Sequence, residues 1–186
     1  MITSRPAATL EVGHLRFRGE AFRAHDPNWS WSPLSGAGAA LRGRRFNWPG
    51  LDTLYLSLSF KTAFREVSAG FAYRLTPYVL CSYDVDCEDI ADLCAEGERT
   101  KAGVALDDLA CAWGDALIAH RDPASWGVVR RLLDAGCAGA LVPSFANGAS
   151  PDERNLVLWR WGPDLPHKVA VYDPTGKLPK SQLSWS

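Results

Sequence analysis

One stretch, residues 34–66, constrains the fold most, because its hydrophobic pattern changes from a two-residue period to a helical period within a dozen positions. Residues 53–57 alternate between apolar and polar side chains, which predicts a short strand. Ser59 then offers an N-cap for a helix over residues 60–69. The apolar positions of this helix have the i, i+3, i+4, i+7 spacing of a stripe buried against a core, and they are Phe60, Ala63, Phe64 and Val67.

The rest of the chain alternates strand and helix signals and contains no repeat and no linker. A turn of helix is expected near residues 37–41, and longer helices over 86–97, 107–120 and 124–135, with Asp86 and Asp107 as candidate caps of the first two. Strands are expected over 14–24, 78–85, 138–142, 155–161 and 168–172, and the last two are candidates for a hairpin. We therefore predict one α+β domain over residues 14–173, with mixed, mostly antiparallel sheets, flanking helices, and tails at 1–13 and 174–186.

Composition excludes several classes of protein. The 186 residues are 47% hydrophobic and 22% charged, as in a globular domain. A net charge of -1 and a pI of about 6.4 argue against direct binding of nucleic acid. The five widely spaced cysteines, four scattered histidines and lack of a long apolar run predict reduced thiols, no metal, no membrane segment and a cytoplasmic location.

An arginine-rich segment is the first candidate for ligand binding. Small residues at 35–40 allow a ligand to approach the backbone, and Arg42, Arg44 and Arg45 follow at once. Guanidinium groups bind phosphate in bidentate fashion, although a run of charges is usually a solvated face. The Gly36-Ala37-Gly38 motif does not make a dinucleotide-binding loop, because Leu41 stands where the third glycine should be.

Four other polar residues are candidates, each with an ordinary structural alternative. Arg23 can clamp a ligand or lie on a polar face, and Tyr55 can stack on a ligand or belong to the core. Glu66 stands to one side of the apolar helix stripe, so it can face a cleft or simply water. Ser144 and Asn155 border a loop, where ligand contacts and turn capping are both common.

Taken together, these residues resemble a known family. Phe22-Arg23, the segment 34–39, Gly43-Arg44-Arg45-Phe46-Asn47, Leu54-Tyr55-Leu56-Ser57 and Glu66 resemble the RES domain, and 141–144 and 155–158 are similar to its closing motifs. The resemblance covers about Phe22 to Trp159. The chain departs from the family at two motifs. The family often has Gly-Gly-Arg-Trp where this chain has Gly43-Arg44-Arg45-Phe46, and it often has Tyr-Arg where this chain has Phe22-Arg23.

The resemblance implies a bacterial toxin of a toxin–antitoxin pair, with a fold related to ADP-ribosyltransferase toxins and NAD+ as substrate. It implies cleavage of the nicotinamide–ribose bond, with transfer of ADP-ribose to a protein, to water or to phosphate, and a helix-turn-helix antitoxin that covers the active site. It assigns catalysis to Glu66, Tyr55 and Arg23, and NAD+ binding to Arg23, Arg45, Tyr55, Ser144 and Asn155.

Two other classes of function stay open from the residues alone. An RNA-directed toxin such as a ribonuclease would need a basic surface and a His or Lys acid/base pair, which the composition disfavours. A non-catalytic module would bind NAD+ or a partner without turnover.

Overall fold

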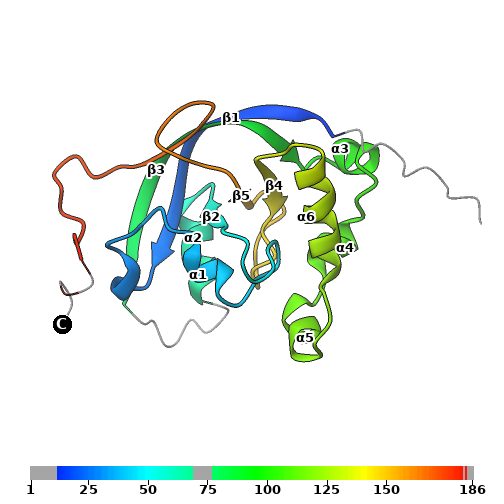
Figure 1. The fold of residues 1–186 in the computed structure, drawn as a ribbon, viewed down its shortest axis with the longest axis horizontal. Helices are drawn as coiled ribbons and strands as arrows, with labels where there is room; N and C mark the ends of the chain where they lie inside the picture. Colours follow the sequence, from blue (N-terminus) through cyan, green and yellow to red (C-terminus); the bar gives the residue numbers. More distant parts are fainter. Residues whose placement is uncertain (1–11, 69–76, 182, 184–186) are drawn as a thin grey trace, which may run out of the picture.

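Two long antiparallel strands, β1 (His14–His25) and β3 (Val79–Asp92), are the frame of the fold. The computed structural model describes residues 12–68, 77–181 and 183. In Figure 1 the two strands arch side by side over the other elements. They pair from His14 opposite Ala91 to His25 opposite Val79, so the predicted first strand is confirmed and extends by one residue.

Four shorter strands complete a six-stranded sheet: β2 (Leu54–Ser57), β4 (Gly139–Pro143), β5 (Arg154–Leu158) and β6 (His167–Val171). Their pairings form a circuit β1-β2-β5-β4-β3, which the β1–β3 ladder closes, and β6 pairs with β3. Only β3 and β4 pair in parallel among the named strands of the described residues. The predicted α+β class with a mixed, mostly antiparallel sheet is confirmed.

The curled sheet is apolar on both faces. Its inner face carries one core cluster, which includes Leu54, Leu56, Tyr83 and Leu156. The outer face of β4 and β5 carries a second cluster, in which Val142 and Val157 meet the helices. Because side chains alternate along each strand, successive residues of β2, β4 and β5 contribute to the two clusters in turn.

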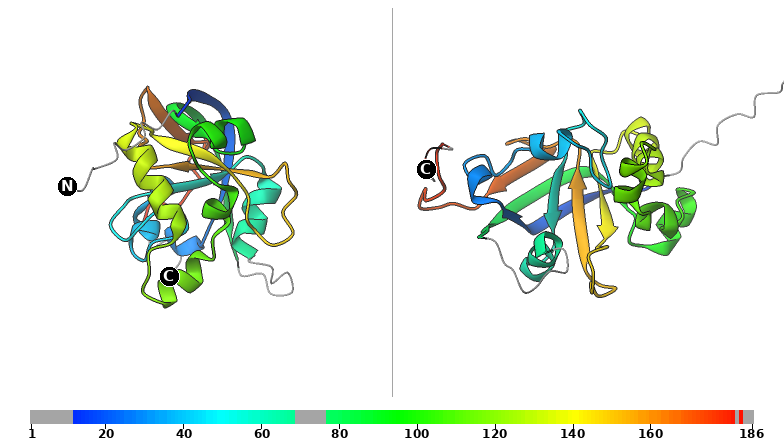
Figure 2. Two further views of the ribbon diagram at one scale, coloured as in Figure 1. Left: turned by 90° about the vertical axis from the view of Figure 1, so that its right-hand side faces the viewer. Right: turned by 90° about the horizontal axis from the view of Figure 1, so that it is seen from below.

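The helices lie mostly beside the sheet's outer face, and Figure 2 shows several of them gathered at one end of the strands. The long helix α6 (Ala124–Asp134) buries Val128, Val129 and Leu132 in the outer cluster. The remaining helical elements are short apart from α2, and their bounds are η1 (Pro27–Trp29), α1 (Ala37–Ala40), α2 (Phe60–Ser68), α3 (Glu96–Lys101), α4 (Leu106–Ala110) and α5 (Trp113–Ile118).

The helix predicted over residues 86–97 is wrong, because β3 continues to Asp92. The alternation of buried and more exposed side chains continues beyond Val85, and Cys87 is fully buried. Asp86 caps no helix; its carboxylate accepts hydrogen bonds from Arg16 on β1. Pairing with β1 along its whole length stabilises β3 as a strand where the local sequence favoured a helix.

Three further details differ from the prediction. The helix expected over 107–120 is two helices, α4 and α5, with extended backbone at Cys111 between them, and Asp107 is not the cap because Ala105 is. Strands β5 and β6 do not form a hairpin, since β6 pairs with β3. The expected end of α2 at residue 69 lies outside the described residues, whereas Trp159 is buried in the core as predicted.

The apolar stripe of α2 is only partly buried. Ala63 and Thr62 face the sheet, but 64% of Phe60 and 47% of Phe64 are exposed. Phe60 contacts Phe22 edge to face on β1, at 6.4 Å between ring centroids. The helix therefore lies against the sheet through its small side chains and leaves two aromatic rings at the surface.

Gly139, at the start of β4, shows how tightly β4 and β5 approach each other. A Cβ atom there would lie 2.5 Å from the Val157 carbonyl oxygen and 2.7 Å from Leu158 Cδ2. We expect Gly139→Ala to lower the free energy of unfolding by about 1–3 kcal/mol, because a backbone oxygen cannot move without shifting the ladder. Urea unfolding measures this change.

The matched control is Gly127→Ala on α6, where a Cβ atom meets no atom within 4 Å. This variant should be as stable as the wild type or more stable by up to about 1 kcal/mol, because alanine favours helix. Equal stabilities for the two variants would contradict the close approach of the strands.

Candidate active site

Three neighbouring strands bring polar side chains to one edge of the outer sheet face. Ser57 ends β2 and pairs with Asn155 of β5, which in turn pairs with Val142 of β4. Ser144 follows two residues after Val142, so alternation turns it to the same face. Ser57 Oγ donates a hydrogen bond of 2.7 Å to Asn155 Oδ1, and this contact fixes the direction in which the amide nitrogen of Asn155 points.

Glu66 on α2 completes this cluster. Its Oε1 atom accepts one hydrogen bond from Asn155 Nδ2, at 2.5 Å, and another from Ser144 Oγ, at 2.7 Å. The residue is exposed, so its carboxylate remains in contact with solvent. Asn155 of β5 and Ser144, the residue after β4, hold it in place. Both donors bind the same oxygen, Oε1. The structure therefore brings together three of the predicted site residues.

Arg45 adds a positive charge near Glu66. Its Nη1 atom donates to the carbonyl oxygens of Leu109 and Cys111, at 2.9 and 2.7 Å, and its guanidinium carbon lies 4.8 Å from the centre of the Phe145 ring. Burial lowers the pKa of Arg45, while the Glu66 carboxylate opposes that shift. Arg45 thus both anchors the α4–α5 connection and sets the charge beside the carboxylate.

Arg23 lies on the other face of the sheet. It shares the inner face of β1 with buried Ala21, and its Nη1 atom donates to the carbonyl oxygens of Pro33 and Ser35. Burial lowers the pKa of Arg23. The pKa of His25 falls to about 3, because His25 is itself buried and lies near the positive charge of Arg23. Among the described residues no direct contact joins Arg23 to Glu66.

Tyr55 is half-buried and forms internal hydrogen bonds. Its hydroxyl donates to Asn47 Oδ1 at 2.9 Å and accepts from the Phe46 backbone N–H at 3.1 Å. Burial raises the pKa of this hydroxyl, so it stays protonated. The contacts tie β2 to the segment that carries Arg45, which makes Tyr55 a link between the strand and the arginine.

Ser57 is the member of the cluster that was not among the predicted site residues. It is buried, and its hydroxyl orients Asn155. The signal for it is a polar residue that ends an apolar alternating strand, two positions after Tyr55 and hence on the same face.

Within the part of the chain that the structure describes, no group of three or more His, Cys, Asp or Glu residues is arranged to hold a metal ion. None of the described helices has the length and apolar character needed to cross a bilayer.

Comparisons with known proteins identify a family and a related fold. A family profile described as RES domain matches residues 20–181. Among solved structures, a chain of the M. tuberculosis MbcT–MbcA toxin–antitoxin complex has a similar fold, with a TM-score of 0.61 and 24% sequence identity over 87% of this chain and 85% of that chain. No curated protein matches.

The contacts of Tyr55 predict that its hydroxyl stabilises the fold. Tyr55→Phe removes the partner of the Phe46 N–H and of Asn47, so we expect the free energy of unfolding to fall by about 1–3 kcal/mol. Tyr78→Phe, which alters a more exposed hydroxyl bonded to the Val67 carbonyl, is the control and should change stability less. Denaturant unfolding that gives both variants the same stability would contradict the role of Tyr55.

Proposed function

Because the chain belongs to the RES domain family, we propose that it is the toxin of a toxin–antitoxin pair and that it cleaves the nicotinamide–ribose bond of NAD+. ADP-ribose is transferred to a protein acceptor, to water or to phosphate. The domain extends over residues 14–173 and acts in the cytoplasm without a metal ion. A fold shared with a chain of a toxin–antitoxin complex supports the toxin role.

The observation that carries the proposal is the exposed Glu66 carboxylate, held through one oxygen by Ser144 and Asn155. A carboxylate fixed in this way needs little reorganisation when positive charge develops beside it. Its second oxygen is the group we assign to the ribose hydroxyls and the anomeric carbon of the nicotinamide ribose.

The proposed reaction breaks one bond and forms one. The bond between the anomeric carbon and the nicotinamide nitrogen breaks, and nicotinamide leaves as a neutral molecule with the bonding electrons. The ribose then has oxocarbenium character, as in glycoside hydrolysis, and Glu66 stabilises its positive charge. An acceptor oxygen or nitrogen adds to the anomeric carbon and loses its proton to solvent, so no strong general acid is required.

The other site residues position the substrate in this proposal. Arg45 binds the pyrophosphate, and the charge of Arg23 adds to the field around it. Ser144 and Asn155 fix the Glu66 carboxylate, and the carboxylate in turn binds the nicotinamide-side ribose. We assign two roles to Tyr55: its hydroxyl fixes the segment that carries Arg45, and its ring stacks on the nicotinamide side of the substrate.

The proposed partner is a helix-turn-helix antitoxin that covers the Glu66 site. The exposed rings of Phe60 and Phe64 support this, because they stand on the same helix as Glu66 and would be buried by a protein that covers it. Large exposed apolar groups next to a site are typical of a protein interface.

We expect Glu66→Gln to retain the fold and to lower the rate of nicotinamide release from NAD+ by about 10²–10³-fold or more, because the amide carries no charge to stabilise the oxocarbenium ion. Incubation of pure protein with NAD+ and chromatography of free nicotinamide measures the rate. The control is Glu96→Gln, a surface carboxylate on α3, which should match the wild type.

The same assay separates the alternatives. A wild-type chain that binds NAD+ without releasing nicotinamide is a binding module. A chain that cleaves RNA and leaves NAD+ intact is a ribonuclease. Turnover by Glu66→Gln at the wild-type rate would reject Glu66 as the catalytic carboxylate.

Expression of the chain in bacteria should arrest growth, and co-expression of its helix-turn-helix partner should restore it, because the partner excludes NAD+ from the site. Intracellular NAD+ should fall only in arrested cells, and cells that express Glu66→Gln serve as the control. Arrest with an unchanged NAD+ level and no ADP-ribosylated protein would contradict the proposed activity.

A further inference from the structure

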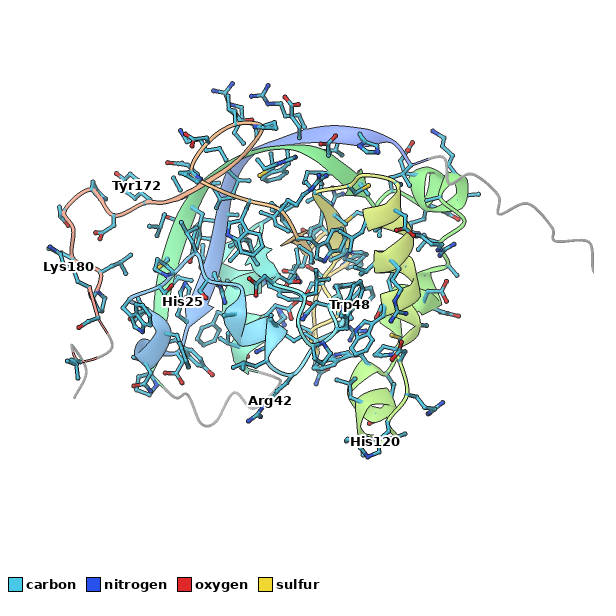
Figure 3. All side chains as sticks on the ribbon, in the orientation of Figure 1. His25, Arg42, Trp48, His120, Tyr172 and Lys180 are labelled. Atoms are coloured by element: carbon cyan, nitrogen blue, oxygen red, sulfur yellow. The ribbon has the colours of Figure 1, made fainter. Side chains whose placement is uncertain are left out.

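A cavity of about 330 Å³ lies between the arginine-rich segment and α5, apart from the Glu66 cluster. Its lining includes Gly38, Arg42, Arg44, Trp113 and Gly114. Figure 3 shows Arg42 at the edge of the molecule on the side where the chain reaches His120, just after α5. The cavity combines an aromatic ring, two guanidinium groups and three glycines in one small space.

Of the residues that the structure describes, two arginines and no acidic residue line the cavity. Residues 27–51 contain no acidic side chain, and Arg42 and Arg44 form no ion pair with an acidic residue of the described part of the chain. Burial, and to a smaller extent the charge of Arg44, lowers the pKa of Arg23, so these two guanidinium groups lie near enough to interact. Such a site favours an anion, and guanidinium groups favour phosphate in particular.

Arg45 connects this cavity to the Glu66 cluster. Its side chain holds the carbonyl oxygen of Cys111, two residues before Trp113, while the next residue back, Arg44, lines the cavity. Arg45 also interacts electrostatically with Glu66. Arg45 therefore lies between the cavity and the Glu66 carboxylate, and it contacts the α4–α5 connection.

The size of the cavity limits its occupant. A volume of about 330 Å³ is at the lower end of the roughly 300–1,000 Å³ of ligand pockets, which suits half of a dinucleotide but not the whole. Trp113, which is partly exposed, can stack on a base, and Arg44 can bind the attached phosphate.

We propose that the cavity between α1 and α5 binds the adenylate half of NAD+, with Trp113 against adenine and Arg44 on the adenosine phosphate. The dinucleotide then extends past Arg45 to place its nicotinamide ribose at Glu66. This inference rests on the proposed function for the choice of NAD+, and its binding test uses AMP alone so that the cavity is tested independently of turnover.

Two glycines allow the cavity to be filled without disturbing the fold. A Cβ atom at Gly38 or at Gly114 meets no atom within 4 Å, and neither glycine has a positive φ. A leucine at Gly38, within α1, therefore occupies the cavity and also favours helix. Gly127→Leu is the matched control, because Gly127 is equally open but lies on the exposed side of α6.

Calorimetry with AMP and with nicotinamide mononucleotide tests the assignment. Gly38→Leu and Trp113→Ala should each weaken AMP binding at least tenfold and leave the affinity for nicotinamide mononucleotide unchanged. With NAD+ as substrate, the same variants should raise KM at least tenfold with little change in kcat, because the lost contacts are remote from the bond that breaks. Gly127→Leu should match the wild type in every assay.

The outcomes separate this inference from the proposed function. Wild-type AMP affinity in folded Gly38→Leu, or a wild-type chain that does not bind AMP, overturns the adenylate site even if nicotinamide is released. AMP binding that is lost in Gly38→Leu, in a wild-type chain that releases no nicotinamide, supports the cavity as an adenylate site and rejects the proposed reaction.

Discussion

The register of β2, β5 and β4 is the constraint on which the rest of the site depends. Ser57, Asn155 and Ser144 reach one edge of one sheet face only because Ser57 opposes Asn155 and Asn155 opposes Val142. A slip of one residue in either ladder would turn one member of the set to the inner core. The same register brings the backbones so close at Gly139 that a side chain has no room there.

Arginines in this protein serve structure and electrostatics together. Arg45 and Arg23 each donate to two backbone carbonyl oxygens, which orders the loops around them, and Arg45 also places its charge near Glu66. Burial lowers the pKa of both guanidinium groups, but arginine remains protonated at neutral pH. In each arginine a single Nη1 atom donates both of these hydrogen bonds.

Hydrophobic periodicity and turn residues predicted an element correctly where that element's own residues determine its structure. The strand at β2, the turn of helix at α1 and the helix α6 with its end at Gly136 follow from periodicity and turn residues. The prediction failed where pairing with a distant segment determines the structure. The second half of β3 has a helical sequence pattern but pairs with β1 as a strand. The prediction also misjudged α2, whose Phe60 and Phe64 are largely exposed while Thr62 and Ala63 are buried.

The sequence by itself determined the chemistry that the chain carries: a carboxylate after a strand and helix start, an arginine-rich segment, and the motifs that are similar to the RES domain. Only the tertiary structure decided which of those groups meet. It joins Glu66 to Ser144 and Asn155 across 78 and 89 residues of chain, and it turns Arg23 to the opposite sheet face. The reason is that side-chain type is a local property, whereas strand register and the packing of α2 are fixed by contacts between segments far apart in the chain.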